Sequence, residues 1–99
     1  MKFSFQNTDL ENLYYMGEGI KDYPAFVGKA FFKKVSMIKN AKNENDIRAI
    51  KGNHFEKIKG EDNLYSIRLN DQYRLEFSIE ESDCKSILIK KISNNYSKT

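Results

Sequence analysis

The feature that most constrains the fold is a strict alternation of apolar and polar residues between positions 65 and 80, interrupted by a short polar turn. The apolar positions are Tyr65, Ile67 and Leu69 before the turn, and Tyr73, Leu75, Phe77 and Ile79 after it. Period-two alternation is typical of half-buried strands, and a short polar gap between two such strands indicates a hairpin. We therefore expect an antiparallel hairpin with one apolar and one polar face.

The length of the turn decides which residues face each other. A two-residue loop would pair Arg68 with Tyr73 and mix apolar and polar side chains on each face. A three-residue loop, residues 70–72, pairs Leu69 with Tyr73 and keeps the apolar set together, and a buried face selects register strongly. This register also places Arg68 opposite Arg74. Like charges directly across a sheet destabilise it by about 0.2–1 kcal/mol, so we expect an anion to bind between the two guanidiniums.

Two helices are expected before the hairpin. Thr8 or Asp9 is expected to cap the first helix, and Gly17 to end it. Pro24 suits the first turn of the second helix. That helix carries a stripe of apolar residues at intervals of four and three, which indicates a buried face; the stripe is Val27, Phe31, Val35 and Ile38. A brief helical turn is expected over residues 46–50.

Short strands are expected at residues 2–5, 54–58 and 87–92, and His54 and Glu56 would share one face of the second of these. The resulting order predicts a single α+β domain over residues 1–99. Two N-terminal helices would pack on one face of a mainly antiparallel β-sheet and leave the other face open. Arg68 and Arg74 would project from the open face.

Composition excludes several classes of protein. A single cysteine and a single histidine are too few for an internal disulfide or a zinc site of the usual kind, and there is no glycine-rich phosphate loop. We expect no metal and no cofactor. No apolar run approaches the roughly 20 residues of a membrane span, and the start does not resemble a signal peptide, so we expect a cytoplasmic protein without a membrane partner.

The positive charge is unevenly distributed. Residues 25–43 contain five lysines and no acidic residue, and residues 84–99 contain four lysines and again no acidic residue. Such clustering indicates a basic face for a polyanion, with an ordinary solvated surface as the alternative.

At this point the chain resembles a known family, the HigB-type plasmid maintenance "killer" toxins of the RelE/ParE superfamily of bacterial toxin–antitoxin systems. The resemblance covers nearly the whole chain and is most specific in the hairpin. The matching segments are Lys59-Gly60 with Ser66–Phe77, Leu10–Tyr14 with Gly17, and the tail Ser93–Tyr96. In many relatives that tail reads serine-asparagine-histidine-tyrosine.

The resemblance implies a RelE-like fold and the toxin of a type II toxin–antitoxin system. Such toxins are ribosome-dependent endoribonucleases that cut mRNA in the A site of the ribosome, on the 30S subunit beside its ribosomal RNA, and so inhibit translation and arrest growth. A cognate helix-turn-helix (HigA-type) antitoxin is implied as well, and operator DNA would be bound only through it. Two alternatives stay open: a weakened toxin-fold protein that binds ribosomes or nucleic acid without cleavage, and a ParE-like inhibitor of gyrase.

Metal-independent RNA cleavage needs a base for the 2′-hydroxyl, stabilisation of the phosphorane charge and an acid for the 5′-oxygen. Arg68 and Arg74 suit the second task, because a guanidinium is permanently charged and binds phosphate through two hydrogen bonds. The resemblance places both at the active site. It also implies that Tyr96 positions the RNA and takes part in proton transfer. Asn95 stands where many relatives carry histidine, so a general acid–base group is missing there.

Two residues are candidates to replace that histidine. His54 is suited by its chemistry, whereas Glu56 aligns better with a histidine that some relatives carry in this strand. Each candidate also has a non-functional alternative. His54 and the lysines could be ordinary surface residues. The arginines could form ion pairs with Glu56 or Glu76, and Tyr96 could belong to a poorly fixed terminus. The RNA-binding candidates are Lys57, Lys59, Tyr73, Lys90, Lys91 and Lys98.

Overall fold

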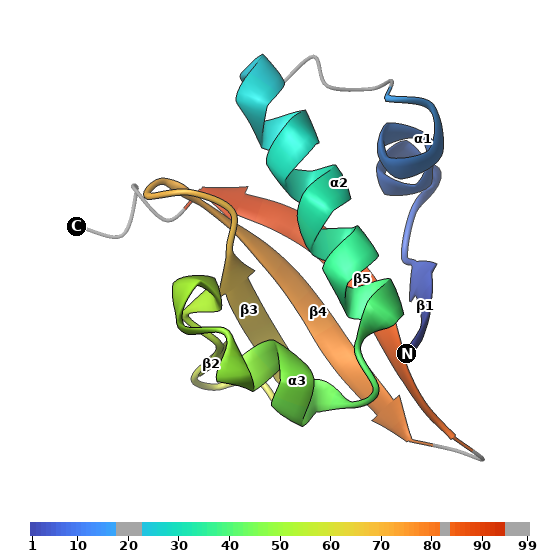
Figure 1. The fold of residues 1–99 in the computed structure, drawn as a ribbon, viewed down its shortest axis with the longest axis vertical. Helices are drawn as coiled ribbons and strands as arrows, with labels where there is room; N and C mark the ends of the chain where they lie inside the picture. Colours follow the sequence, from blue (N-terminus) through green and yellow to red (C-terminus); the bar gives the residue numbers. More distant parts are fainter. Residues whose placement is uncertain (18–22, 82–83, 95–99) are drawn as a thin grey trace.

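A computed structural model describes residues 1–17, 23–81 and 84–94 of the chain. Figure 1 shows helices on one side of a single sheet. In chain order the elements are β1 (Lys2–Phe5), α1 (Thr8–Met16), α2 (Ala25–Asn40), α3 (Glu44–Ala49), the 3-10 helix η1 (Lys51–Asn53), β2 (Glu56–Lys57), β3 (Leu64–Arg68), β4 (Tyr73–Glu81) and β5 (Lys85–Asn94).

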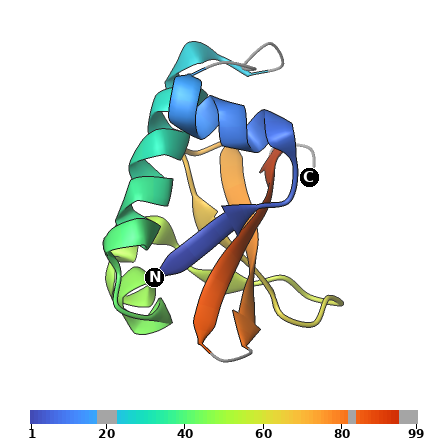
Figure 2. The same cartoon turned by 90° about the vertical axis from the view of Figure 1, so that its right-hand side faces the viewer.

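The two layers are those that the sequence predicts. Helices α1 and α2 lie on the same side of the sheet, as Figure 2 shows. The sheet has the order β1-β5-β4-β3-β2, in which β1 runs parallel to β5 and the other neighbours are antiparallel. The α+β class and the mainly antiparallel sheet are therefore confirmed. Within the described ranges, no helix is long and apolar enough to cross a membrane.

The hairpin has the predicted register. Ile67 pairs with Leu75, and Arg68 pairs with Arg74. Both apolar residues are fully buried beneath the helices, so their neighbours in each strand point to the opposite face. The register that buries the apolar set therefore directs both arginines away from the core.

The turn of the hairpin is organised by one side chain. Asn70 Oδ1 accepts hydrogen bonds from the backbone N–H groups of Gln72, at 3.0 Å, and Tyr73, at 2.7 Å. The N–H of Leu69 donates to the carbonyl of Tyr73 at 2.9 Å and closes the loop. Asparagine favours such turns because its side chain can bond to the backbone two residues ahead.

Helices α1 and α2 differ from expectation at their starts, and the helical turn expected over residues 46–50 is α3, which begins and ends slightly earlier. Asn7 caps α1, since its side chain accepts a hydrogen bond from the N–H of Leu10 at 2.9 Å. The predicted caps Thr8 and Asp9 are wrong because both are already helical. Gly17 ends α1 at a φ of +70°, as predicted. Pro24 directly precedes α2 instead of lying in its first turn.

The apolar stripe of α2 forms the centre of the core. Its residues are fully buried and face the inner surface of β3, β4 and β5. The fully buried side chains of the core are Val27, Phe31, Val35, Ile38, Ile47, Ile67, Leu75, Phe77, Ile87 and Ile89. Burial of a side chain of this size stabilises the fold by about 1.5–3 kcal/mol.

The predicted strand over residues 54–58 is wrong at its start. The only ladder pairs in this segment are Glu56 with Ser66 and Lys57 with Tyr65. His54 has a φ of +46° and ends η1, with its N–H bonded to the carbonyl of Lys51. A residue in the left-handed region cannot continue a strand, so His54 and Glu56 do not share a strand face.

The last strand carries a β-bulge that the sequence analysis did not predict. Glu76 pairs with Lys91, but Phe77 pairs with Ile89, so Lys90 has no residue opposite it in β4. The extra residue lets the isoleucines on both sides of the bulge face the helices. It also places Lys91 on the open face of the sheet, where its ammonium lies 4.0 Å from a carboxylate oxygen of Glu76.

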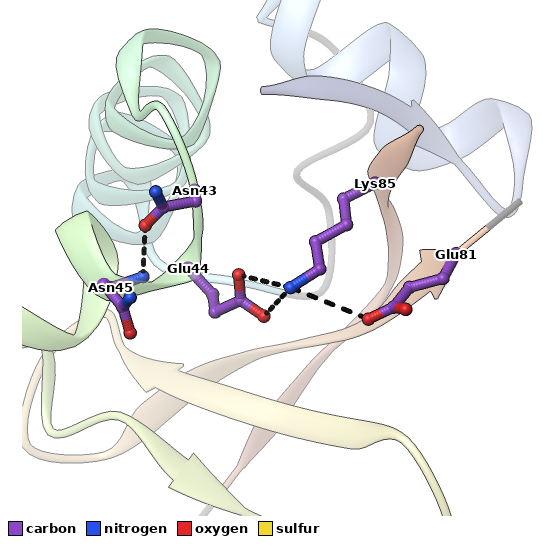
Figure 3. A network of polar contacts seen from close by, with 5 residues as sticks. All are labelled: Asn43, Glu44, Asn45, Glu81 and Lys85. Atoms are coloured by element: carbon purple, nitrogen blue, oxygen red, sulfur yellow. Dashed lines mark hydrogen bonds and ion pairs between the residues drawn. The ribbon is translucent and has the colours of Figure 1, made fainter. Parts of the chain in front are cut away.

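An exposed ionic network attaches α3 to the far end of the β4–β5 hairpin (Figure 3). The ammonium of Lys85 donates to both carboxylate oxygens of Glu44, at 2.9 and 3.0 Å, and lies 3.6 Å from Glu81. Hydrogen bonding to Lys85 lowers the pKa of Glu44. Asn43 caps the same helix by accepting a hydrogen bond from the N–H of Asn45 at 2.9 Å.

Candidate functional site

The open face of the sheet contains a cavity of about 310 Å³. One wall of the cavity is formed by residues 56–59, which include β2, and the other by the outward faces of β3, β4 and β5. Strand alternation explains its composition, because each lining residue of the sheet neighbours a core residue. The lining residues are Glu56, Lys57, Ile58, Lys59, Ser66, Arg74, Glu76 and Ser93.

Arg74 is held in this cavity by neutral oxygen atoms. Its Nε donates to Ser66 Oγ at 2.9 Å, and its Nη2 donates to the carbonyl of His54 at 2.5 Å and to that of Ser66 at 3.4 Å. Among the described residues, no carboxylate forms an ion pair with this guanidinium. The predicted alternative, in which Glu56 or Glu76 bridges the arginine, is therefore not found, and the positive charge is available to an anion.

Arg68 lies opposite Arg74 in the ladder, but its guanidinium has a different partner. It forms an ion pair and hydrogen bond with the exposed carboxylate of Asp71 in the turn. Arg68 is not among the described residues that line the cavity. The predicted pairing of the two arginines is thus confirmed, whereas a single anion-binding position shared by both guanidiniums is not seen.

A positive region extends from Arg68 toward α2. The pKa of Lys34 is lowered, first by partial burial and then by the charges of Lys33 and Arg68. The charges of Lys33 and Arg68 each disfavour the charged form of Lys34. The positive charge of Arg68 therefore acts on a residue of the second helix.

The remaining polar groups of the cavity differ in their exposure. Glu56, Lys57 and Lys59 are exposed, whereas Glu76 is only 9% exposed and lies near Lys91. Glu56 is therefore the accessible carboxylate in a site that also offers three positive groups. Such a site is suited to bind a phosphodiester and to accept a proton from a hydroxyl group.

Five of the predicted site residues in the described part of the chain do not line the cavity, namely Arg68, His54, Tyr73, Lys90 and Lys91. Tyr73 is 8% exposed and packs edge-on against Tyr23, with ring centroids 5.8 Å apart. The side chain of Tyr73, which was predicted to bind RNA, thus faces the core and not the cavity, because the register that turns Arg74 outward turns Tyr73 inward. The side chain of His54 is exposed, and only its carbonyl group reaches the site. Lys90 lies in the bulge outside the lining.

Three other predicted residues, Asn95, Tyr96 and Lys98, lie outside the described part of the chain. Ser93 lines the cavity, so the chain enters this segment close to the site.

Two supporting residues were missed from the sequence. Ser66 accepts a hydrogen bond from Arg74 and so fixes its position. The hairpin register places Ser66 on the same face as Arg74, and this register could have identified Ser66 from the sequence. Asn53 is fully buried, donates to the carbonyl of Ile47 at 2.9 Å and accepts a hydrogen bond from the ammonium of Lys34. It thereby fixes η1 just before the carbonyl that holds the arginine. An asparagine among turn residues gives no sequence signal for such burial.

Comparison with known proteins agrees with this architecture. A family model described as "RelE-like toxin of type II toxin-antitoxin system HigB" matches residues 3–91. An uncharacterized protein of Haemophilus influenzae is 32% identical over 92 residues, which are 92% of this chain and 91% of that protein. The Toxin HigB-1 of Vibrio cholerae is 36% identical over 80 residues, which are 78% of this chain and 82% of that toxin.

A solved structure shows the same fold at low sequence identity. A YoeB/ParE toxin from Agrobacterium tumefaciens superimposes with a TM-score of 0.58 at 13% identity, covering 95% of this chain and 98% of the other. Together with the family match over most of the chain, this fold agreement leads to one conclusion. The chain belongs to the HigB-like family of RelE-like toxins of type II toxin–antitoxin systems.

Proposed function

We propose that this protein is a ribosome-dependent endoribonuclease that cuts mRNA in the ribosomal A site, without a metal ion, and so inhibits translation in the cytoplasm. The observation that carries the proposal is the state of Arg74. Its guanidinium is fixed by Ser66 and the carbonyl of His54 inside a basic cavity, and no carboxylate of the described residues neutralises it. A fixed, uncompensated positive charge is what stabilisation of a phosphorane requires.

Residues of the cavity wall and of the tail are proposed for the other roles. Glu56 is the group proposed to accept the proton of the 2′-hydroxyl, since it is an exposed carboxylate on the cavity wall. Lys57 and Lys59 bind the flanking phosphates. Tyr96 donates a proton to the leaving 5′-oxygen, in agreement with the resemblance of the tail to its family pattern.

Arg68 takes part after it releases Asp71. The carboxylate of Asp71 is 94% exposed, and an exposed ion pair is worth about 0–1 kcal/mol. A phosphate that approaches the end of the hairpin can therefore replace this carboxylate at small cost. In this scheme the two arginines bind successive parts of the RNA backbone, with the 30S subunit and its ribosomal RNA as the surroundings.

Mapping of new mRNA ends tests the proposal. After induction of the parent chain, primer extension should find new 5′ ends within translated codons, and these should disappear when translation is blocked. Arg74→Ala should remove them and relieve growth arrest while the protein stays folded. Arg48→Ala is the matched control. Arg48 belongs to α3, its guanidinium lies over the ring of Phe55, and it does not line the cavity.

Three results would count against the proposal. Growth arrest without new mRNA ends would indicate a toxin that binds ribosomes or nucleic acid without cleavage, the alternative that Asn95 raises. Inhibition of purified gyrase in a supercoiling assay would instead indicate ParE-like activity. A folded Arg74→Ala variant that cuts as well as the parent would remove the arginine from the mechanism.

A further inference from the structure

Two different parts of the chain hold the guanidinium of Arg74. Ser66 lies in the neighbouring strand β3 and accepts a hydrogen bond from Nε at 2.9 Å, so this contact comes with the register of the hairpin. The carbonyl of His54 accepts from Nη2 at 2.5 Å, and it belongs to the segment between α3 and β2. The direction in which the guanidinium points therefore depends on how that segment is fixed.

His54 presents this carbonyl from an unusual backbone conformation. Its φ of +46° and ψ of +54° lie in the left-handed region, which a residue with a β-carbon adopts at a cost in free energy. The sheet gives the segment little support, since β2 consists of two exposed residues, Glu56 and Lys57. Such a conformation persists only where the surrounding structure imposes it, so the main support lies on the other side of His54, in η1.

Asn53, the residue before His54, provides this support. Its side chain is fully buried. The amide nitrogen donates to the carbonyl of Ile47 in α3 at 2.9 Å, and Oδ1 accepts from the ammonium of Lys34 in α2 at 2.5 Å. A hydrogen bond from a charged donor is stronger than a neutral one. The bond between Lys34 and Asn53 therefore ties η1 firmly to the helix at the centre of the core.

Contacts that start at this bond run from the helical layer to the open face of the sheet. Helix α2 covers one face, as Figure 1 shows, whereas Arg74 projects from the other. Neither Lys34 nor Asn53 is among the described residues that line the cavity. An effect of their bond on the cavity therefore passes through the carbonyl of His54 to Arg74.

We propose that Lys34 and Asn53 are positioning residues, whose mutual hydrogen bond fixes the orientation of Arg74 through the carbonyl of His54. Without this bond, η1 is released from α2 and the carbonyl loses its fixed place. The guanidinium then keeps only its contacts with Ser66 and turns more freely. A charge stabilises a transition state best when it is oriented beforehand. The effect on cleavage rests on the proposed function, whereas the effect on the guanidinium does not.

Hydrogen exchange of the arginine Nε–H groups tests the positioning in the absence of RNA. The chain has three arginines, so their signals are few in a nitrogen-15 NMR spectrum, and Arg74→Lys identifies the signal of Arg74. Asn53→Ala should speed the exchange of this hydrogen with water by about tenfold or more, because the lost hydrogen bond is to a charged group. Lys34→Met should act in the same direction but less strongly, since it leaves the bond to Ile47.

Cleavage on purified ribosomes that carry a defined mRNA tests the consequence. In both variants the rate at saturating ribosome concentration should fall by about tenfold, while the concentration for half-maximal rate stays within about twofold, because groups that bind the RNA backbone are unchanged. Ile87→Ala is the matched control. Ile87 is fully buried where β5 pairs with β1 and does not line the cavity, so its truncation weakens the core but should change neither readout.

Urea unfolding shows which variants are folded at the assay temperature. If Asn53→Ala does not fold, Lys34→Met decides. The proposal is overturned if the Nε–H of Arg74 exchanges as slowly in the folded variants as in the parent, or if Ile87→Ala speeds the exchange equally, since the cause would then be a general loss of stability. A parent chain that cuts no mRNA contradicts the proposed function alone, because the exchange rates still decide whether the bond orients Arg74.

Discussion

Replacing Asn53 with alanine tests how η1 is held beside the cavity. The Asn53 side chain is fully buried and bonds to three groups from two other parts of the chain. Its Oδ1 accepts a hydrogen bond from the ammonium of Lys34, and its Nδ2 donates to the carbonyl of Ile47 at 2.9 Å and contacts the sulfur of Met37 at 3.2 Å. Alanine keeps the backbone but removes all three contacts.

The expected loss of stability follows from the two stronger bonds. A hydrogen bond to a charged group contributes about 1.5–3 kcal/mol, and a neutral one about 0.5–1.5 kcal/mol. The ammonium of Lys34 can turn partly toward water, which favours the low end for the first, whereas the carbonyl of Ile47 stays buried without a donor. We therefore expect Asn53→Ala to lower the free energy of unfolding by about 2–4 kcal/mol, a large part of the roughly 5–15 kcal/mol typical of a domain.

Urea unfolding of the purified chain, followed by circular dichroism, measures this loss. A double-mutant cycle with Lys34→Met isolates the bond between the two side chains, and its coupling energy should exceed about 1 kcal/mol. If Asn53→Ala unfolds within about 0.5 kcal/mol of the parent with an unchanged m-value, Asn53 does not hold η1 and the calculation is wrong.

Two smaller effects are expected elsewhere. Asn70→Ala removes both hydrogen bonds that organise the hairpin turn and should cost about 1–2 kcal/mol in the same urea assay; no measurable change would show that the turn forms without its side chain. Lys85 lowers the pKa of Glu44, so the contribution of that carboxylate is present above its unfolded-state pKa and is lost as the pH falls through the lowered folded value. Glu44→Gln should therefore be slightly less stable than the parent near neutral pH and should converge with it in acid, when melting temperatures are compared; a gap that is constant with pH would contradict the ion pair.

Periodicity was enough to predict the hairpin and the second helix, because each buries one face against the core. The register at Ile67 follows from which face must be apolar, and the burial of Phe31 follows from its place in a stripe of helical spacing. Both features follow from the spacing of apolar residues within one segment of the sequence.

Features set by contacts distant in sequence were not predictable in this way. His54 has a positive φ at the end of η1, and η1 is fixed by the bond of Asn53 to Lys34, a residue of α2 that lies far from residues 54–58 in the sequence. The bulge at Lys90 did have a signal. Ile89 and Ile92 are three apart, so both can face one layer only if the strand gains an extra residue between them.

The arginine pair shows the limit of a prediction made from register alone. Facing guanidiniums repel, and the sequence indicated that an anion would relieve this repulsion. In the folded chain the relief is local, since Asp71 neutralises Arg68, and Arg74 donates to the oxygens of Ser66 and His54. Folding of the hairpin therefore does not require bound RNA.

The capacity to bind phosphate nevertheless remains. A guanidinium has five N–H donors, and the contacts of Arg74 within the described chain use Nε and Nη2. Both hydrogens of Nη1 have no partner there. Because the neutral contacts fix the plane of the group without cancelling its charge, a phosphate can bind to Nη1 without displacing Ser66. The two arginines thus differ in kind: Arg74 is oriented by neutral oxygen atoms, whereas the charge of Arg68 is already paired with the carboxylate of Asp71.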